Sequence, residues 1–270
     1  MFFKILLIGG GIALCSCTHK GRVEVAENHV QWDSVVVNRT CHSASADTKP
    51  NCSLQLSFIY PVDFLDKSIL KSVQKLFILD YFGSDYANMT PEKAAEKYAD
   101  DYISNMIRDE DKVQDEDRPA FEYYQTSNNR ILYNRDDLLS VTVGRETFSG
   151  GAHNNHKQVN RVIDLKTGRA LSEKDLFIDD YREDLAKIIV DNISASNNVD
   201  SAPELENVGF LSVSEIAPNG NFYVDDTGIT YIYNEYDIAA YAVGPVVVQL
   251  PYETVRHLLR ADSPLAAIAF

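Results

Sequence analysis

The chain has 270 residues, of which 45% are hydrophobic and 24% charged, values typical of a globular protein with a core. Its formal charge of −15 argues against nucleic acid and anionic lipid surfaces as partners. The same charge favours a cationic partner, or serves solubility alone.

The N-terminus predicts a bacterial lipoprotein. Residues 1–16 carry one charge, Lys4, before an apolar run at 5–14 that is too short to span a bilayer comfortably and fits a signal peptide. The run ends in Leu14-Cys15-Ser16-Cys17, which resembles the lipobox and implies cleavage before Cys17 and a diacylglycerol thioether on its sulfur; Cys15 is the competing position. Residues 17–29 then form a tether. We expect a lipid-anchored envelope protein, on the periplasmic side rather than the cell surface, because no acidic cluster follows Cys17.

Two cysteines remain in the exported chain, and they predict a disulfide between Cys41 and Cys52. Closing a loop of about 12 residues stabilises the fold by roughly 3 kcal/mol. A metal site is the alternative, with His42 as the adjacent ligand. The bridge would join two strands, at residues 30–38 and 53–60, as a hairpin.

Two helices follow the hairpin. Apolar residues at three- and four-residue spacing predict the first over 64–79, with Gly83 as its stop. The second begins at Thr90 and Pro91, which suit the N-cap and the first helical position.

A meander of antiparallel strands comes next, at residues 121–126, 130–134, 138–147 and 159–165. The turns between them are predicted at Asn128-Asn129, at residues 135–137 and in a loop at 149–156. A tight turn after the last strand places Gly168 at positive φ.

The C-terminal part alternates helices and short strands. Ser172 and Asp175 form a capping box before one or more helices. Strands are predicted at 210–216, 221–224, 228–233 and 245–250, and a final helix begins at Pro251. The element order fits an α+β fold, with antiparallel β-sheets, packed helices and two intertwined modules.

The motifs from Gly150 onward resemble those of RsiV-like proteins. They are Gly150-Gly151-Ala152-His153, Asp164-Leu165-Lys166-Thr167-Gly168, Leu176-Phe177, Asp226-Thr227-Gly228-Ile229, Tyr233-Asn234-Glu235-Tyr236-Asp237-Ile238-Ala239, Tyr241-Ala242-Val243-Gly244 and Pro251-Tyr252-Glu253. The resemblance implies a C-terminal module at 141–270, a domain of unknown function similar in fold to an ATPase subdomain of heat-shock cognate proteins. It also implies a PdaC-like N-terminal module at 30–140. The sequence shows no deacetylase domain and no P-loop motif. We expect no cytoplasmic sigma-binding region, because the residues before Cys17 are expected to be removed.

The candidate site is the glycine–histidine loop and the tyrosine-rich segment after residue 230. Its residues are Gly150, Gly151, His153, His156, Tyr233, Asn234 and Tyr236. The loop is expected to be structural or to bind a ligand, with His153 holding the glycine pair by a hydrogen bond. A zinc site would need further ligands, and the acidic candidate, Asp164, is on the following strand. A nucleophile pair of Ser149 and His153 lacks an ordering carboxylate.

These observations predict a binding or sensing module without enzymatic activity, cofactor or metal. The RsiV-like resemblance implies a cationic protein such as a lysozyme as partner, besides the membrane reached through Cys17. The alternative is a peptidoglycan- or glycan-binding accessory protein in which Tyr231, Tyr233, Tyr236 and Tyr241 form a stacking surface. A hydrolase or metal enzyme using His153 and His156 is the third hypothesis.

Overall fold

The structure, a computed structural model, describes residues 27–41, 52–64, 66–110, 123–150 and 152–269. The predicted signal peptide, the lipidation residue Cys17, most of the tether and Gly151 lie outside the described residues.

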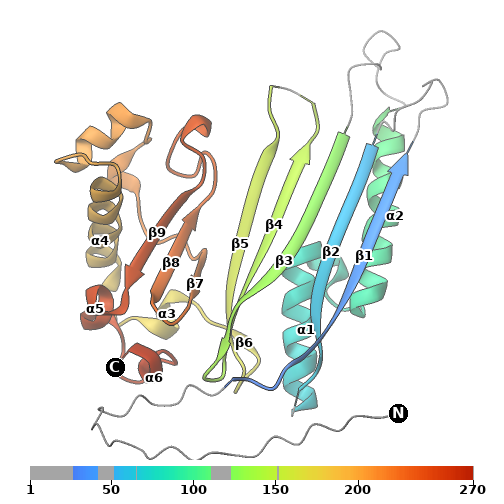
Figure 1. The fold of residues 1–270 in the computed structure, drawn as a ribbon, viewed down its shortest axis with the longest axis horizontal. Helices are drawn as coiled ribbons and strands as arrows, with labels where there is room; N and C mark the ends of the chain where they lie inside the picture. Colours follow the sequence, from blue (N-terminus) through green and yellow to red (C-terminus); the bar gives the residue numbers. More distant parts are fainter. Residues whose placement is uncertain (1–26, 42–51, 65, 111–122, 151, 270) are drawn as a thin grey trace, which may run out of the picture.

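A six-stranded sheet forms one half of the molecule (Figure 1). Its strands, in spatial order, are β1 (Gln31–Cys41), β2 (Cys52–Asp63), β3 (Tyr123–Arg135), β4 (Leu138–Phe148), β5 (Asn155–Asp164) and β6 (Arg169–Ala170). Neighbouring strands are antiparallel except for β2 and β3, which pair in parallel. A parallel pair needs a long crossover connection, and the helices α1 (Lys67–Phe82) and α2 (Pro91–Glu110) provide it.

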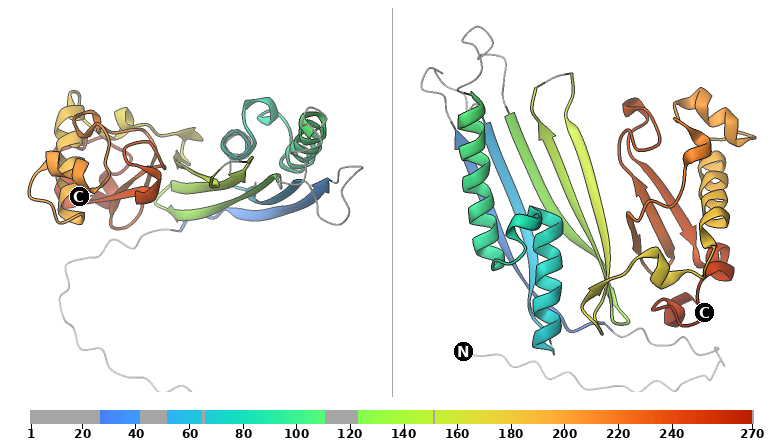
Figure 2. Two further views of the ribbon diagram at one scale, coloured as in Figure 1. Left: turned by 90° about the horizontal axis from the view of Figure 1, so that it is seen from above. Right: turned by 180° about the vertical axis from the view of Figure 1, so that it is seen from behind.

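Both helices cover the same face of this sheet, and among the described residues no helix lies on its opposite face (Figure 2). Alternate β2 residues, Leu54, Leu56 and Phe58, are buried beneath them because successive strand side chains point to opposite faces. Tyr81 of α1 is fully buried and donates its hydroxyl to the carbonyl oxygen of Ser127 at 2.7 Å. On the opposite face, Leu138, Ser140 and Val162 are buried in a second core, whereas the residues of β1 and β2 are largely exposed.

The boundaries of α1 follow from its end residues. The side chain of Asp66 accepts hydrogen bonds from the backbone N–H groups of Ser68 and Ile69 at the N-cap. Gly83 ends the helix at φ 104°, which confirms the predicted stop, because this left-handed region favours glycine. The predicted turn glycine, Gly168, likewise has φ 69°.

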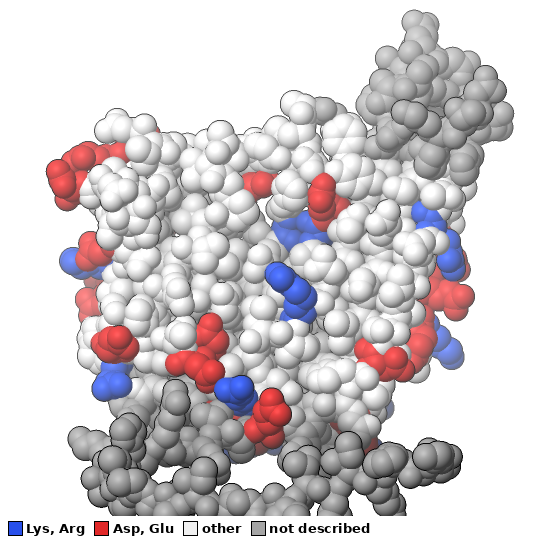
Figure 3. Space-filling view, viewed as in Figure 1, with Lys and Arg blue, Asp and Glu red and all other residues white. Residues whose placement is uncertain are grey.

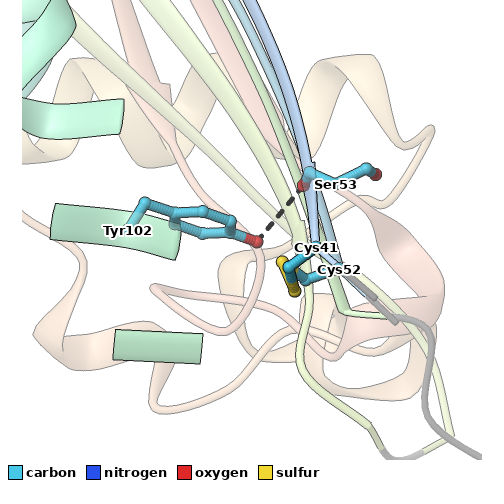
Figure 4. The surroundings of a disulfide bond; sticks show 4 residues. All are labelled: Cys41, Cys52, Ser53 and Tyr102. Atoms are coloured by element: carbon cyan, nitrogen blue, oxygen red, sulfur yellow. Dashed lines mark hydrogen bonds between the residues drawn. A yellow bond between two sulfur atoms is a disulfide. The ribbon is translucent and has the colours of Figure 1, made fainter. Parts of the chain in front are cut away.

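The predicted disulfide is confirmed. Cys41 and Cys52 are bonded, with their Cα atoms 5.1 Å apart, and they stand opposite each other at the end of the β1–β2 pair. Both are buried. Tyr102 of α2 lies beside them and donates to the carbonyl oxygen of Ser53 (Figure 4). The bridge thus joins the hairpin where the helix layer also contacts it.

A smaller three-stranded antiparallel sheet forms the other half. Its strands are β7 (Phe222–Val224), β8 (Gly228–Tyr233) and β9 (Val246–Pro251), and α4 (Tyr181–Ser196) packs on β9. The remaining short helices are α3 (Glu173–Leu176), η3 (Ala202–Val208), η4 (Val213–Glu215), η5 (Tyr241–Val243), α5 (Tyr252–Val255), η6 (Arg256–Leu258) and α6 (Ala266–Ala269), with η1 (Ser84–Tyr86) between α1 and α2. The capping box of Ser172 and Asp175 is present at α3.

Two sequence predictions are wrong. Asn128 and Asn129 lie inside the continuous strand β3 rather than in a turn. The side chain of Asn129 accepts from Ile59 N–H at 2.8 Å and donates to the Ile59 carbonyl at 2.7 Å, so it continues the ladder where the backbone pairing with β2 ends at Ser57. Residues 210–216 form a single bridge at Phe210 and the turn η4 instead of a strand.

The α+β class with mainly antiparallel sheets is confirmed. The predicted division at residue 140 falls within β4, so the large sheet draws strands from both sides of it. In the described part of the chain, no helix is both long and apolar enough to cross a membrane.

Candidate functional site

The predicted loop lies where the two sheets meet, at the upper end of the molecule in Figure 1. It connects β4 to β5, with Gly150 at φ 89° and His153 exposed. The segment between β8 and β9 lies against it. The predicted residues from both segments are therefore brought together, and we call their meeting place the corner site. It consists of Tyr124, Glu146, His153, Asn154, His156, Glu235, Tyr236 and Tyr241.

His156 connects two carboxylates. Its Nδ1 lies 2.9 Å from Oε1 of Glu235, and its backbone N–H donates to Oε2 of the same residue at 3.3 Å. Its Nε2 lies 3.9 Å from Glu146, which stands opposite it in the β4–β5 register. The Glu235 side chain is 7% exposed, whereas the His156 side chain is 42% exposed and the Glu146 side chain is 39% exposed. Glu235 therefore has a structural role, whereas Glu146 is accessible to solvent.

Glu146 is held ionised by neutral donors. The Tyr124 hydroxyl donates to its Oε1 at 2.6 Å, and the Asn154 amide donates to the same atom at 2.5 Å. These hydrogen bonds, the one from Tyr124 first, lower the pKa of Glu146 below its ordinary value. The same contact raises the pKa of Tyr124. The corner therefore presents a carboxylate that keeps its charge in mildly acidic solution.

Three aromatic rings lie beside these carboxylates. His153 stacks on Tyr241 with ring centroids 3.6 Å apart and planes inclined by 15°. The Tyr236 ring lies 5.9 Å from Tyr241, and its hydroxyl is 3.4 Å from Nε2 of His153. Tyr236 is 55% exposed and has φ 68°, a left-handed backbone that is strained for a tyrosine. Strain of this kind at an exposed ring is typical of a recognition site.

Asn234 and Tyr233 have structural positions. Asn234 accepts from the backbone N–H of Gln158 at 2.7 Å and donates to its carbonyl oxygen at 3.1 Å. Asn221 also bonds to the β5 backbone: it accepts from Asn160 N–H at 2.7 Å and donates to the Gln158 carbonyl oxygen at 3.0 Å. We call these two side chains the asparagine ladder, because they satisfy the β5 edge in place of a strand. Tyr233 is buried and donates to Ala217.

A hollow of about 620 Å³ lies beside the ladder. Lys157, Arg182 and Arg161, the last paired with Asp80, supply positive charge to its wall, and Glu215 and Asp237 supply negative charge. The mixture gives it no preference for a ligand of one charge.

The structure bears on the remaining alternatives. Both ring nitrogens of His153 face other groups, the Asn154 carbonyl at 3.1 Å and Tyr236, rather than Ser149. Within the described ranges, no group of three or more His, Cys, Asp or Glu side chains is placed to hold a metal ion. Asp164 lies at the far end of β5 and accepts from Lys166 N–H and the Thr167 hydroxyl in the turn.

Sequence reasoning missed Tyr124 and Glu146 as members of the site. A signal for Glu146 was available, because a hairpin folded symmetrically about Gly151 pairs it with His156, as the observed register does. Tyr124 lies on the strand beyond, opposite Phe148, and requires the order of the sheet to be known.

The fold and the site define an α+β protein with two sheets that meet at a polar, aromatic corner. Residues 174–253 match the family described as "Protein of unknown function (DUF3298)". The chain is similar to the crystal structure of a DUF3298 family member from Bacteroides fragilis, with 31% sequence identity, a TM-score of 0.83 and coverage of 90% of this chain and 98% of that one. The chain therefore belongs to the DUF3298 family.

A second solved structure shows the fold alone. It is a DUF3298 family protein from Pseudomonas aeruginosa PAO1, with 12% identity, a TM-score of 0.60 and coverage of 87% of this chain and 97% of that one. No curated protein matches the sequence. The matched family segment includes Glu235, Tyr236 and Tyr241, whereas the rest of the corner site comes from the large sheet before it.

Proposed function

We propose that this chain is a lipid-anchored binding module of the bacterial envelope that recognises a cationic protein, without catalysing a reaction. The single observation that carries the proposal is the corner site, where the exposed, strained Tyr236 is connected through His153 and Asn154 to the carboxylate of Glu146. A lysozyme is the first partner to test.

The corner suits an arginine or lysine side chain of a partner. A guanidinium or ammonium group placed over the Tyr236 ring is attracted to the π-electrons by about 0.5–2 kcal/mol. Glu146 offers a charged acceptor on the same surface, and charge-assisted hydrogen bonds are about twice as strong as neutral ones. The formal charge of −15 would also speed the encounter with a basic protein.

The resemblance to RsiV-like proteins supports a lysozyme as partner, which the match to the DUF3298 family does not address. One member of the RsiV-like family, RsiV, binds lysozyme through its extracellular region, and the motifs that resemble the family include the residues 233–239 that contribute Glu235 and Tyr236. We also propose the PdaC-like assignment for residues 30–140. The lipobox supports attachment through Cys17 and a position on the periplasmic side.

The test is calorimetric titration of the purified full chain with hen lysozyme across a salt series. We expect a complex that survives at about 0.15 M salt, where the Debye length is about 8 Å and long-range attraction is screened. Tyr236→Ala and Glu146→Gln should each weaken it at least tenfold, about 1.4 kcal/mol. Glu253→Gln, which removes an exposed charge on α5, is the matched control and should bind as the wild type does. The proposal fails if no complex forms at low salt, or if the corner variants bind like the control.

A further inference from the structure

On the face of the large sheet that carries no helix among the described residues, the side chains form rows that run across the strands. Residues paired across neighbouring strands have side chains on the same face, so the printed register defines each row. One row runs Asn38, Gln55, Thr126, Glu146 and His156, from β1 to β5. The next runs Val36, Ser57, Asn128, Gly144 and Gln158. The first of these rows ends in the corner site.

The chemistry of the rows differs from that of the whole chain. Their side chains are mainly hydroxyls and carboxamides, in a protein in which 24% of residues are charged. Asn38, Gln55, Ser57 and Asn128 are exposed, and Val36 is 65% exposed. Figure 3 shows this face as largely uncharged, with most acidic and basic residues towards its edges. Such a face offers many neutral donors and acceptors and little net charge.

An aromatic pair stands at the upper end of the same face. Tyr124 and Phe148 are opposite each other on β3 and β4, with ring centroids 6.0 Å apart and planes inclined by 22°. Both are half-buried, which leaves part of each ring surface accessible. Thr40 and Ser53 continue this row across β1 and β2.

We infer that the exposed part of this face, over β1, β2 and the upper part of β3, binds a neutral polysaccharide chain lying across the strands. Sugar hydroxyl and acetamido groups both donate and accept hydrogen bonds, as do the carboxamides and hydroxyls of the rows. The apolar faces of sugar rings pack on aromatic rings such as Tyr124 and Phe148.

Other occupants fit the face less well. A protein docking by hydrophobic burial would need a contiguous apolar patch, whereas Val36 and Ile59 stand among polar neighbours. A polyanion would need a basic surface, and the basic side chain at the lower part of these strands is Arg130. The glycan proposal uses different residues from the tyrosine surface suggested by sequence, because Tyr231 and Tyr233 are buried.

The experiment is calorimetric titration of the purified full chain with chitohexaose and, separately, with cellohexaose. Ser57→Arg places a long charged side chain in the middle of the face. Ser104→Arg makes the same change at an exposed position of α2, away from the rows, and is the matched control. Because both serines are exposed, neither change removes a core contact, and thermal unfolding checks that both variants fold.

We expect binding of at least one hexasaccharide, weakened at least tenfold by Ser57→Arg and unchanged by Ser104→Arg. The inference is overturned if neither hexasaccharide binds at millimolar concentration, or if the two variants behave alike. Lysozyme binding is measured in parallel. Since Tyr236→Ala should weaken that binding at least tenfold and leave the hexasaccharide titration unchanged, failure of one proposal is distinguishable from failure of the other.

Discussion

Glu235 holds His156 by two contacts, one to the imidazole and one to the backbone. Nδ1 of His156 lies 2.9 Å from Oε1, and the backbone N–H donates to Oε2 at 3.3 Å. The two residues are 79 positions apart in the sequence and belong to the segments that follow β8 and begin β5. A single nearly buried carboxylate therefore fixes the loop of the small sheet against the edge of the large one.

Glu235→Ala should destabilise the fold by about 1–3 kcal/mol, because it leaves a partly buried N–H and an imidazole without their acceptor. Glu235→Gln should cost less, since the amide oxygen can still accept one of the two hydrogen bonds. Urea unfolding measures both variants. Glu253→Ala, at an exposed position, is the control and should lie within about 0.5 kcal/mol of the wild type. Equal midpoints for Glu235→Ala and the control would contradict the assigned role.

The asparagine ladder makes a second prediction. Asn234→Ala removes the acceptor of the Gln158 N–H, a 2.7 Å hydrogen bond, and leaves the edge of β5 partly unpaired. Amide exchange at Gln158 should accelerate, by about tenfold for each 1.4 kcal/mol lost, as followed by NMR. Asn155→Ala changes an exposed asparagine at the start of the same strand and should leave that amide protected. Unchanged exchange at Gln158 in Asn234→Ala would show that the side chain does not support the edge.

Most helices and strands were predictable because their boundaries are determined by residues close to them in the sequence. Gly83 ends α1 and Ser172 with Asp175 caps α3, as their residue types indicate. Asn129 was misread for the opposite reason. An asparagine suits a turn, but here its side chain bonds to Ile59, 70 residues earlier, and that partner is defined only once β2 and β3 pair in parallel.

The two segments that form the candidate site were predictable from the sequence, but the contacts between them were not. The glycine–histidine loop and the segment around Tyr236 were identified from their residue types, and they do meet. The acid considered as a further ligand for His153 and His156, Asp164, lies at the other end of β5, whereas Glu235 reaches His156 through the contact between sheets. Contacts of this kind depend on tertiary packing, which periodicity and spacing do not encode.

The hydrogen bond from Tyr124 to Glu146 makes the corner site sensitive to pH. Since the pKa of Glu146 is lowered in the folded protein, its stabilising contribution is fully present above the ordinary value near 4.5 and is lost as pH falls through the lower folded value. Tyr124→Phe removes the largest cause and should move the pKa of Glu146 back up. Carbon-13 NMR titration of the carboxyl group measures this, with Tyr223→Phe as control. A Glu146 titration that is the same in both variants would contradict the assignment.

The last prediction concerns the membrane anchor. If Cys17 carries the diacylglycerol group, Cys17→Ser should abolish fatty-acid labelling in a bacterial host and move the protein from the membrane to the soluble envelope fraction. The reason is energetic, because each buried methylene contributes about 0.8 kcal/mol and several acyl chains are needed for stable attachment. Cys15→Ser tests the competing position and should leave labelling and fractionation unchanged. Labelling that persists in Cys17→Ser and disappears in Cys15→Ser would transfer the anchor to Cys15. Absence of label from the wild type would remove the lipoprotein assignment.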